Sequence, residues 1–169
     1  KMADNQSDSK PVCLITGGSS GIGLATARRF AKQGYDIAIC GRRALQLADA
    51  KKLIVDEGTE FGIECVTHVV DLTDAQQAKD FGETMLRRFG HIDVLVNNAG
   101  YGYVGAIEEG EDEAVRQLFE TNFFGALALT RAVLPQMRKQ GGGRILNNSS
   151  QAGLMANPGT GYYSASKYA

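Results

Sequence analysis

Short apolar runs alternate along this chain with longer stretches of helical periodicity, and this alternation restricts the fold more than any other feature. It builds βαβ units, in which parallel strands are joined by helical crossovers. The runs are almost continuously apolar, as expected when helices cover both faces of a sheet. Right-handed crossovers then favour an α/β fold with a doubly wound, Rossmann-type parallel sheet in three α/β/α layers. We expect strands at 12–16, 35–40, 63–70, 92–97 and 144–150. We expect helices at 22–33, 43–57, 73–90 and from residue 161 onward, and one or two helices at 111–140.

Two local signals refine the expected helices. Thr73 and Gln76 have the spacing of a capping box, which predicts Thr73 as the N-cap of the third helix. Pro135 lies inside the long pattern 111–140. Because proline removes a helical hydrogen bond and clashes with the preceding turn, it predicts a kink or a local break there.

The domain organisation is simple. Residues 1–10 are polar and lack the apolar core of a signal peptide, so they predict a disordered N-terminal tail, in which Lys1 before Met2 is an added residue. Residues 11–169 contain no linker and no repeat, and we expect them to form one Rossmann-type domain.

Composition and charge exclude several classes of protein. The chain is 43% hydrophobic and carries a net charge of −1, with acidic and basic residues interspersed, so neither nucleic acid nor an anionic membrane is an expected partner. No apolar stretch is long enough to span a bilayer. Cys13, Cys40 and Cys65 lie inside apolar runs, which predicts buried, reduced thiols in a cytoplasmic protein. We assign no metal ligands.

A glycine-rich turn, LITGGSSGIGLA at 14–25, follows the first expected strand. In an α/β sheet this turn binds phosphate, because backbone N–H groups and a helix N-terminus carry partial positive charge and glycine lets the ligand approach. The spacing is Thr-Gly-(x)3-Gly-x-Gly, starting at Thr16. The common dinucleotide fingerprint would need glycine at Thr26, and no Gly-Lys-Ser/Thr of a P-loop is present. The alternative interpretation is a flexible connection between a strand and a helix.

Several further polar residues are ambiguous one by one. Asn98 follows the fourth expected strand, Ser150 ends the fifth, and Asn122 lies in a helix that asparagine does not favour. Tyr163 and Lys167 share one face of the last helix at i and i+4. Taken singly, such residues are typical of turns, caps and solvated surfaces.

In this order the pieces resemble the short-chain dehydrogenase/reductase family, over residues 11 to 169 without a break. The match rests on the glycine turn, Asp71, Asn97-Asn98-Ala99-Gly100, Asn122, Ser150 and Tyr163-Ser164-Ala165-Ser166-Lys167. The resemblance implies hydride transfer between a nicotinamide and an alcohol or carbonyl carbon. It further implies that Asn122, Ser150, Tyr163 and Lys167 are catalytic.

The roles implied for these four residues are chemically distinct. Tyr163 would exchange a proton with the substrate oxygen, and a free tyrosine, with its pKa near ~10, needs help to do so at neutral pH. The charge of Lys167, one turn away, would supply that help. Ser150 would hydrogen-bond the substrate oxygen. Asn122 would hold a water beside Lys167, giving the proton a route to solvent.

The resemblance also implies the cofactor site. Asp71 and Leu72 would meet the adenine, and Asn98 would line the ribose side. At the end of the second strand Gly41 replaces the acid that recognises a ribose 2′-OH, and Arg42 follows, so we expect NADP(H) to be preferred over NAD(H). The expected cofactor-binding residues are Gly17, Ser19, Ser20, Gly21, Ile22, Gly23, Arg42, Asp71, Leu72, Asn98, Tyr163 and Lys167.

Two departures from the family pattern stand out. Asn148 occupies a position that is usually an apolar strand residue. Family members also continue for several tens of residues past the lysine, so we expect the natural protein to be longer, with the last strands of the sheet missing here. The implied partner is a small alcohol or ketone, and 101–103, Leu154 and Met155 suggest an apolar one. The family resemblance implies a homodimer or homotetramer.

Two other functions stay open at this stage. One is a non-catalytic nucleotide-binding module on the same fold, which would have no need of all four catalytic residues. The other is a sugar-nucleotide epimerase or dehydratase of the extended branch, whose glycine turn is usually one residue shorter than the interval between Gly17 and Gly21.

Overall fold

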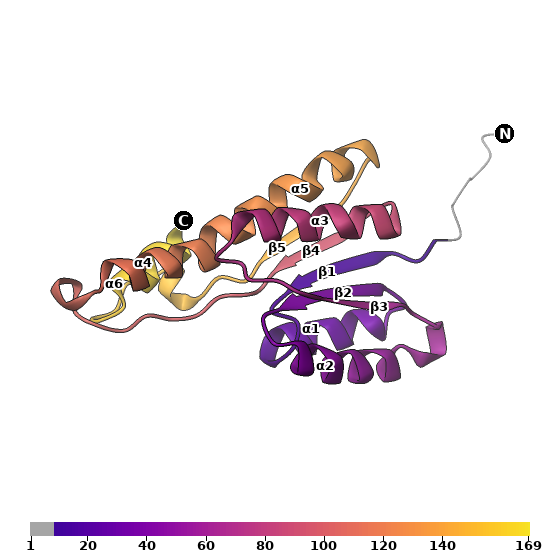
Figure 1. Cartoon of the computed structure of the whole chain (residues 1–169), viewed down its shortest axis with the longest axis horizontal. Helices are drawn as coiled ribbons and strands as arrows, with labels where there is room; N and C mark the ends of the chain where they lie inside the picture. The colour runs from indigo at the N-terminus through magenta and orange to yellow at the C-terminus, as the bar shows by residue number, and fades with distance from the viewer. Residues whose placement is uncertain (1–8) are drawn as a thin grey trace.

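The computed structural model describes residues 9–169, and they contain a single five-stranded sheet in which every neighbouring pair is parallel (Figure 1). The expected tail at 1–10 therefore lies, for residues 1–8, outside the described part of the chain. The sheet order is β3-β2-β1-β4-β5. The strands are β1 (Val12–Thr16), β2 (Asp36–Gly41), β3 (Cys65–Val69), β4 (Val94–Asn97) and β5 (Arg144–Asn147). The doubly wound parallel sheet predicted from the sequence is confirmed.

Helices cover both faces of the sheet. Figure 1 shows α1 (Gly21–Ala31) and α2 (Ala44–Glu57) on one face, and α3 (Ala75–Phe89) and α5 (Gly125–Lys139) on the other. The remaining helical segments, α4 (Asp112–Phe119) and α6 (Gly161–Tyr168), lie beyond the carboxyl ends of the strands. Short helical turns η1 (Thr59–Phe61), η2 (Ile107–Glu109), η3 (Glu120–Phe124) and η4 (Gln151–Gly153) complete the structure.

Two apolar clusters, one on each face, hold the three layers together. Successive residues of a strand point to opposite faces, so each central strand contributes to both clusters. Leu14 of β1 belongs to the cluster under α3 and α5, with Phe81 and Leu129, whereas Ile15 packs with Leu47 and the other residues under α1 and α2. All five side chains are at most 2% exposed. Burial on both faces explains why these strands read as continuous apolar runs.

The three cysteines are buried and free, as the sequence predicted. Cys13 and Cys40 lie on β1 and β2, and Cys65 begins β3. Burial raises the pKa of all three thiols, to about 12 for Cys40 and Cys65. Because the thiolate is the reactive form, these side chains are packing residues. No helix within residues 9–169 is long and apolar enough to cross a membrane.

The predicted capping box at the start of α3 is wrong by one residue. The N-cap is Asp74, whose side chain accepts hydrogen bonds from the backbone N–H groups of Gln76 and Gln77. Thr73 is engaged elsewhere, because its N–H and its hydroxyl both donate to Asp71 Oδ1, at 3.0 and 2.9 Å. Thr73 therefore belongs to the turn after β3, and Asp74, the next residue, caps the helix.

Pro135 does not break its helix, since α5 continues through it to Lys139. Both Pro135 and Arg131, whose carbonyl loses its usual partner, lie on the exposed side of the helix, where water can satisfy that group. The irregularity in this region is instead η3, a stretch of π-helix between α4 and α5. Nothing in the sequence predicted it.

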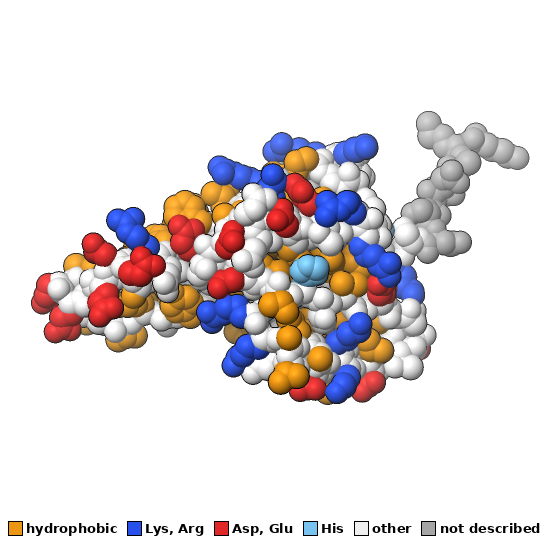
Figure 2. Space-filling model, in the orientation of Figure 1, with side chains coloured by type: hydrophobic (Ala, Val, Ile, Leu, Met, Phe, Trp, Pro, Cys, Tyr) orange, Lys and Arg blue, Asp and Glu red, His pale blue; other side chains and the backbone are white. Residues whose placement is uncertain are grey.

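Charged side chains of both signs are mixed over most of the face shown in Figure 2, but acidic ones gather at the end formed by η2 and α4. Asp112 and Glu113 occupy the first turn of α4. Carboxylates are stabilised there by the partial positive charge of a helix N-terminus. Two of the acidic residues at this end of the molecule therefore stabilise the N-terminus of α4.

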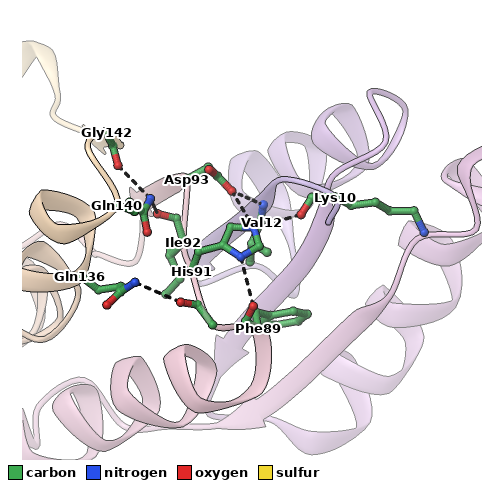
Figure 3. A network of polar contacts seen from close by, with 10 residues as sticks. Lys10, Val12, Phe89, His91, Ile92, Asp93, Gln136, Gln140 and Gly142 are labelled. Atoms are coloured by element: carbon green, nitrogen blue, oxygen red, sulfur yellow. Dashed lines mark hydrogen bonds and ion pairs between the residues drawn. The ribbon is translucent and has the colours of Figure 1, made fainter. Parts of the chain in front are cut away.

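Polar contacts tie the strands together at the amino-terminal edge of the sheet (Figure 3). Asp93 Oδ2 accepts from the Val12 N–H at 2.7 Å and lies 3.4 Å from His91 Nε2. The His91 ring contacts the carbonyl oxygens of Phe89 and Lys10, both at 3.1 Å. The start of β1 is thus attached to the segment before β4 through side chains as well as through the sheet.

Asp93→Ala should lower the free energy of unfolding by about 1–3 kcal/mol, because the buried Val12 N–H loses its acceptor. Urea denaturation monitored by circular dichroism measures this change. The matched control is Asp49→Ala, whose carboxylate pairs only with the exposed Lys52 at 3.3 Å and should change stability by less than about 0.5 kcal/mol. Equal stability of the two variants would contradict the role given to Asp93.

Candidate active site

A cleft of about 590 Å³ opens at the carboxyl ends of the strands. It lies where the strand order reverses, between β1 and β4, which is the usual ligand position in an open α/β sheet. The residues expected from the sequence that line it are Gly17, Ser19, Ser20, Ile22, Arg42, Asp71, Leu72, Asn98, Ser150, Tyr163 and Lys167. Three other expected residues, Gly21, Gly23 and Asn122, do not line it.

The glycine turn is shaped by backbone requirements. Gly17 and Gly21 have φ values of +64° and +52°, a region that favours glycine. A Cβ on Gly23 would lie 2.3 Å from the Gly17 carbonyl oxygen, so α1 packs directly on the turn. Ser20 is the N-cap of α1 but makes no side-chain capping bond. The first N–H groups of α1 therefore have no side-chain acceptor, which suits an anionic ligand in the cleft.

Thr16 and Asn98 join the end of β1 to the end of β4. The Thr16 hydroxyl oxygen accepts hydrogen bonds from the backbone N–H groups of Asn98 and Ala99, both at 3.0 Å. The Asn98 side-chain amide donates in return to the Thr16 carbonyl oxygen at 3.0 Å. Thr16 is 2% exposed, so these bonds are made out of contact with bulk water and hold the floor of the cleft in one geometry.

Asn148, noted from the sequence as a departure from an apolar pattern, has a polar function in the structure. Its side-chain amide donates to Asn98 Oδ1 at 3.0 Å, and its carbonyl oxygen accepts from Lys167 Nζ at 3.0 Å. The strand β5 ends at Asn147, before this residue and short of the predicted boundary at 150. Asn148 also lines the cleft, so sequence reasoning found the residue but not its place in the site.

Asn122 lies in the π-helical segment η3 and holds the loop that follows β4. Its Oδ1 accepts from the Tyr101 N–H at 3.1 Å, while its Nδ2 donates to the Tyr101 carbonyl oxygen at 3.0 Å and to Ser166 Oγ at 2.9 Å. A Cβ on Gly100 would lie 2.9 Å from Asn122 Oδ1 and 3.2 Å from Lys167 Nζ. Asn122 and Lys167 therefore converge on Gly100, although only the lysine lines the cleft.

The remaining expected catalytic residues face the same cleft from the β5 side. Tyr163 and Lys167 lie on one face of α6, and Ser150 precedes η4. The Ser150 hydroxyl oxygen accepts from the Ala152 N–H at 3.2 Å. Ser150 therefore caps η4 and also lines the cleft.

The opposite wall comes from the loops after β2 and β3. Arg42 and Asp71 line it, and a Cβ on Gly41 would lie 3.4 Å from Ser19 Oγ. Asp71 Oδ1 is engaged by Thr73. Arg43 and Tyr101 also line the cleft. The sequence indicated the loop 101–103 as part of an apolar substrate wall, whereas it gave Arg43 no role in the site.

Comparison with known proteins agrees with this geometry. Residues 11–169 match the family model of short chain dehydrogenases. The chain is 37% identical over 158 residues to 3-ketodihydrosphingosine reductase of Bacteroides thetaiotaomicron, covering 94% of this chain and 54% of that protein. It spans about half the length of such relatives.

Solved structures carry the same fold with either nicotinamide nucleotide. L-Sorbose reductase of Gluconobacter frateurii, complexed with NADPH and L-sorbose, superimposes with a TM-score of 0.88 at 34% identity, over 95% of this chain and 60% of that one. The NAD⁺-bound xylitol dehydrogenase gives 0.87 at 33% identity, over 96% and 62%. Fold and cleft together are those of a Rossmann-type α/β domain. The chain belongs to the short-chain dehydrogenase/reductase family.

Gly23→Ala should lower the free energy of unfolding by about 1–3 kcal/mol, because the new methyl group would meet a backbone carbonyl that cannot move without distorting the turn. Nucleotide affinity should fall with it. Thermal unfolding and calorimetric titration with NADPH measure the two effects. Gly142→Ala is the control, since a Cβ there meets nothing within 4 Å. If both variants melt and bind alike, α1 does not depend on this close approach.

Proposed function

We propose that the protein carrying this chain is an NADP(H)-dependent alcohol dehydrogenase or ketone reductase. The observation that carries the proposal is that Ser150, Tyr163 and Lys167 share one cleft with the glycine turn at the N-terminus of α1. A nucleotide phosphate fits the turn, whose positive-φ glycines and α1 N–H groups without side-chain acceptors form an anion site. When bound there, the nicotinamide supplies or accepts the hydride.

The protein's own groups account for the proton that accompanies the hydride. The Tyr163 hydroxyl would donate a proton to the substrate oxygen as a carbonyl is reduced, and would accept it back in the reverse direction. Ser150 would donate a hydrogen bond to the same oxygen and fix its position. Lys167, held by the Asn148 carbonyl at 3.0 Å, would place a positive charge where negative charge develops on that oxygen. Asn122 would hold a water molecule beside Lys167, and this water would give the proton a route to solvent.

The preference for NADP(H) rests on the wall formed after β2. Gly41 offers no carboxylate to a ribose 2′-OH, and the exposed Arg42 faces the cleft. A guanidinium presents a planar set of donors that matches a phosphate. Relatives of this fold bind either nucleotide, so the discrimination depends on these side chains.

The substrate is proposed to be apolar apart from its reacting group. Leu154 and Met155, which follow Ser150 by four and five residues, are 80% and 57% exposed, and Val104 is 81% exposed. Large apolar side chains left in water favour an apolar ligand. The relationship to 3-ketodihydrosphingosine reductase supports the same choice. We further propose a cytoplasmic homodimer or homotetramer, consistent with Phe124 being 44% exposed beside α5.

Tyr163→Phe in the full-length protein should reduce turnover by at least about 100-fold, because the proton donor is removed. The Kd for NADPH should change by less than about threefold. Steady-state assays with a panel of ketones, aldehydes and alcohols, followed by NADPH absorbance, give the rate, and calorimetry gives the affinity. Near-native turnover in this variant would refute the assignment. A wild type that binds NADPH but turns over no member of the panel would instead favour a non-catalytic nucleotide-binding module.

Arg42→Ala should weaken NADPH binding by about tenfold or more and leave NADH binding within about twofold, since only NADPH carries the 2′-phosphate. Wild-type protein should bind NADPH more tightly than NADH. The control is Arg29→Ala, an exposed arginine on α1 outside the cleft, which makes the same change in net charge. Tighter binding of NADH by the wild type would overturn the preference.

A further inference from the structure

Tyr101 lines the cleft together with residues from both of its walls. It follows β4, yet it lines the same cleft as Arg42 and Asp71, which follow β2 and β3. In the sheet order, β1 lies between β4 and these two strands. The proposed function gives Tyr101 no role.

The electrostatic surroundings of the phenol agree with this placement. Burial raises the pKa of the Tyr101 hydroxyl. The positive charge of Arg42 acts to lower this pKa, and the negative charge of Asp71 acts to raise it. Both charged groups therefore act on the hydroxyl from the wall opposite to the one that carries its backbone. The residue as a whole is still 41% exposed, so the ring also faces the open part of the cleft.

Two hydrogen bonds with Asn122 fix the backbone of Tyr101. Asn122 accepts from its N–H at 3.1 Å and donates to its carbonyl oxygen at 3.0 Å. The described structure gives its ring no stacking partner, although Tyr103 on the same loop packs against Tyr162 with ring centroids 5.7 Å apart. Tyr101 is thus an aromatic surface held at a fixed point, with its face available to a ligand.

The residues around Tyr101 indicate which part of the nucleotide would contact its ring. Arg42 and Asp71 are the residues proposed for the adenosine end of the nucleotide. A tyrosine ring combines a flat apolar face with a polar tip, which matches a base and ribose that are flat on one side and polar at the rim. We propose that Tyr101 forms an aromatic wall against which the adenosine half of the bound nucleotide packs. This inference rests on the proposed function, because it assumes that the cleft binds NADP(H).

The test measures the Kd of NADPH, NADH and 2′,5′-ADP by calorimetry in the full-length protein. The last probe carries only the adenosine half. Because aromatic contacts with a base are lost on truncation to alanine, Tyr101→Ala should raise all three Kd values by about tenfold. Tyr101→Phe keeps the ring and should stay within about twofold of wild type. Tyr103→Ala is the matched control for nucleotide binding, since this tyrosine on the same loop does not line the cleft.

Three results would overturn the inference while leaving the proposed function intact. These are a Tyr101→Ala protein that binds within twofold of wild type, one that loses NADPH affinity but keeps 2′,5′-ADP affinity, and a Tyr101→Phe protein that loses as much as the alanine variant. A wild type that binds neither NADPH nor NADH would overturn the proposed function and this inference with it. Thermal unfolding of each variant establishes that the proteins compared are folded.

Discussion

The hydrogen bonds between Thr16 and the turn after β4 are the constraint on which the site depends. One buried hydroxyl oxygen accepts from two successive backbone N–H groups, those of Asn98 and Ala99, both at 3.0 Å. β1 and β4 are neighbours whose crossovers cover opposite faces of the sheet, so the chain diverges at their ends and leaves a crevice. Without a link there, the glycine turn and the residues after β4 would be independent loops.

From this point a chain of polar contacts runs outward to Lys167. Asn98 contacts Asn148, and the Asn148 carbonyl oxygen receives the Lys167 ammonium. A second branch connects Tyr101 through Asn122 to Ser166 on α6. The short helix α6 is therefore attached to the rest of the site by hydrogen bonds at Ser166 and Lys167. Asn122 can take part because the π-helical segment η3 interrupts the α-helical path between α4 and α5, a kind of irregularity that is frequent at functional sites.

The two ends of the sheet are used differently. At the amino-terminal edge, Asp93 and His91 make polar contacts with the backbone of Val12 and Lys10. At the carboxyl edge the polar groups stand around an open cleft of about 590 Å³. The apolar middle layer, with its buried thiols, separates the two ends. The residues that join the strand starts are therefore distinct from those that line the cleft.

The sequence alone determined the parallel three-layer fold, because residues buried on both faces of a strand leave an apolar run that needs no tertiary information to recognise. It also indicated that Ser150, Tyr163 and Lys167 would line the crevice, as they do. Other expected residues, Gly21, Gly23 and Asn122, lie outside the lining. Only the tertiary structure decided how those residues are held. The structure placed Asn122 in a π-helix. The hydrogen bonds that Asn122 makes with Tyr101, and those that Asn148 makes with Asn98 and Lys167, join residues 19 to 50 positions apart. Such contacts have no periodicity along the chain, because they depend on where the sheet brings distant loops together.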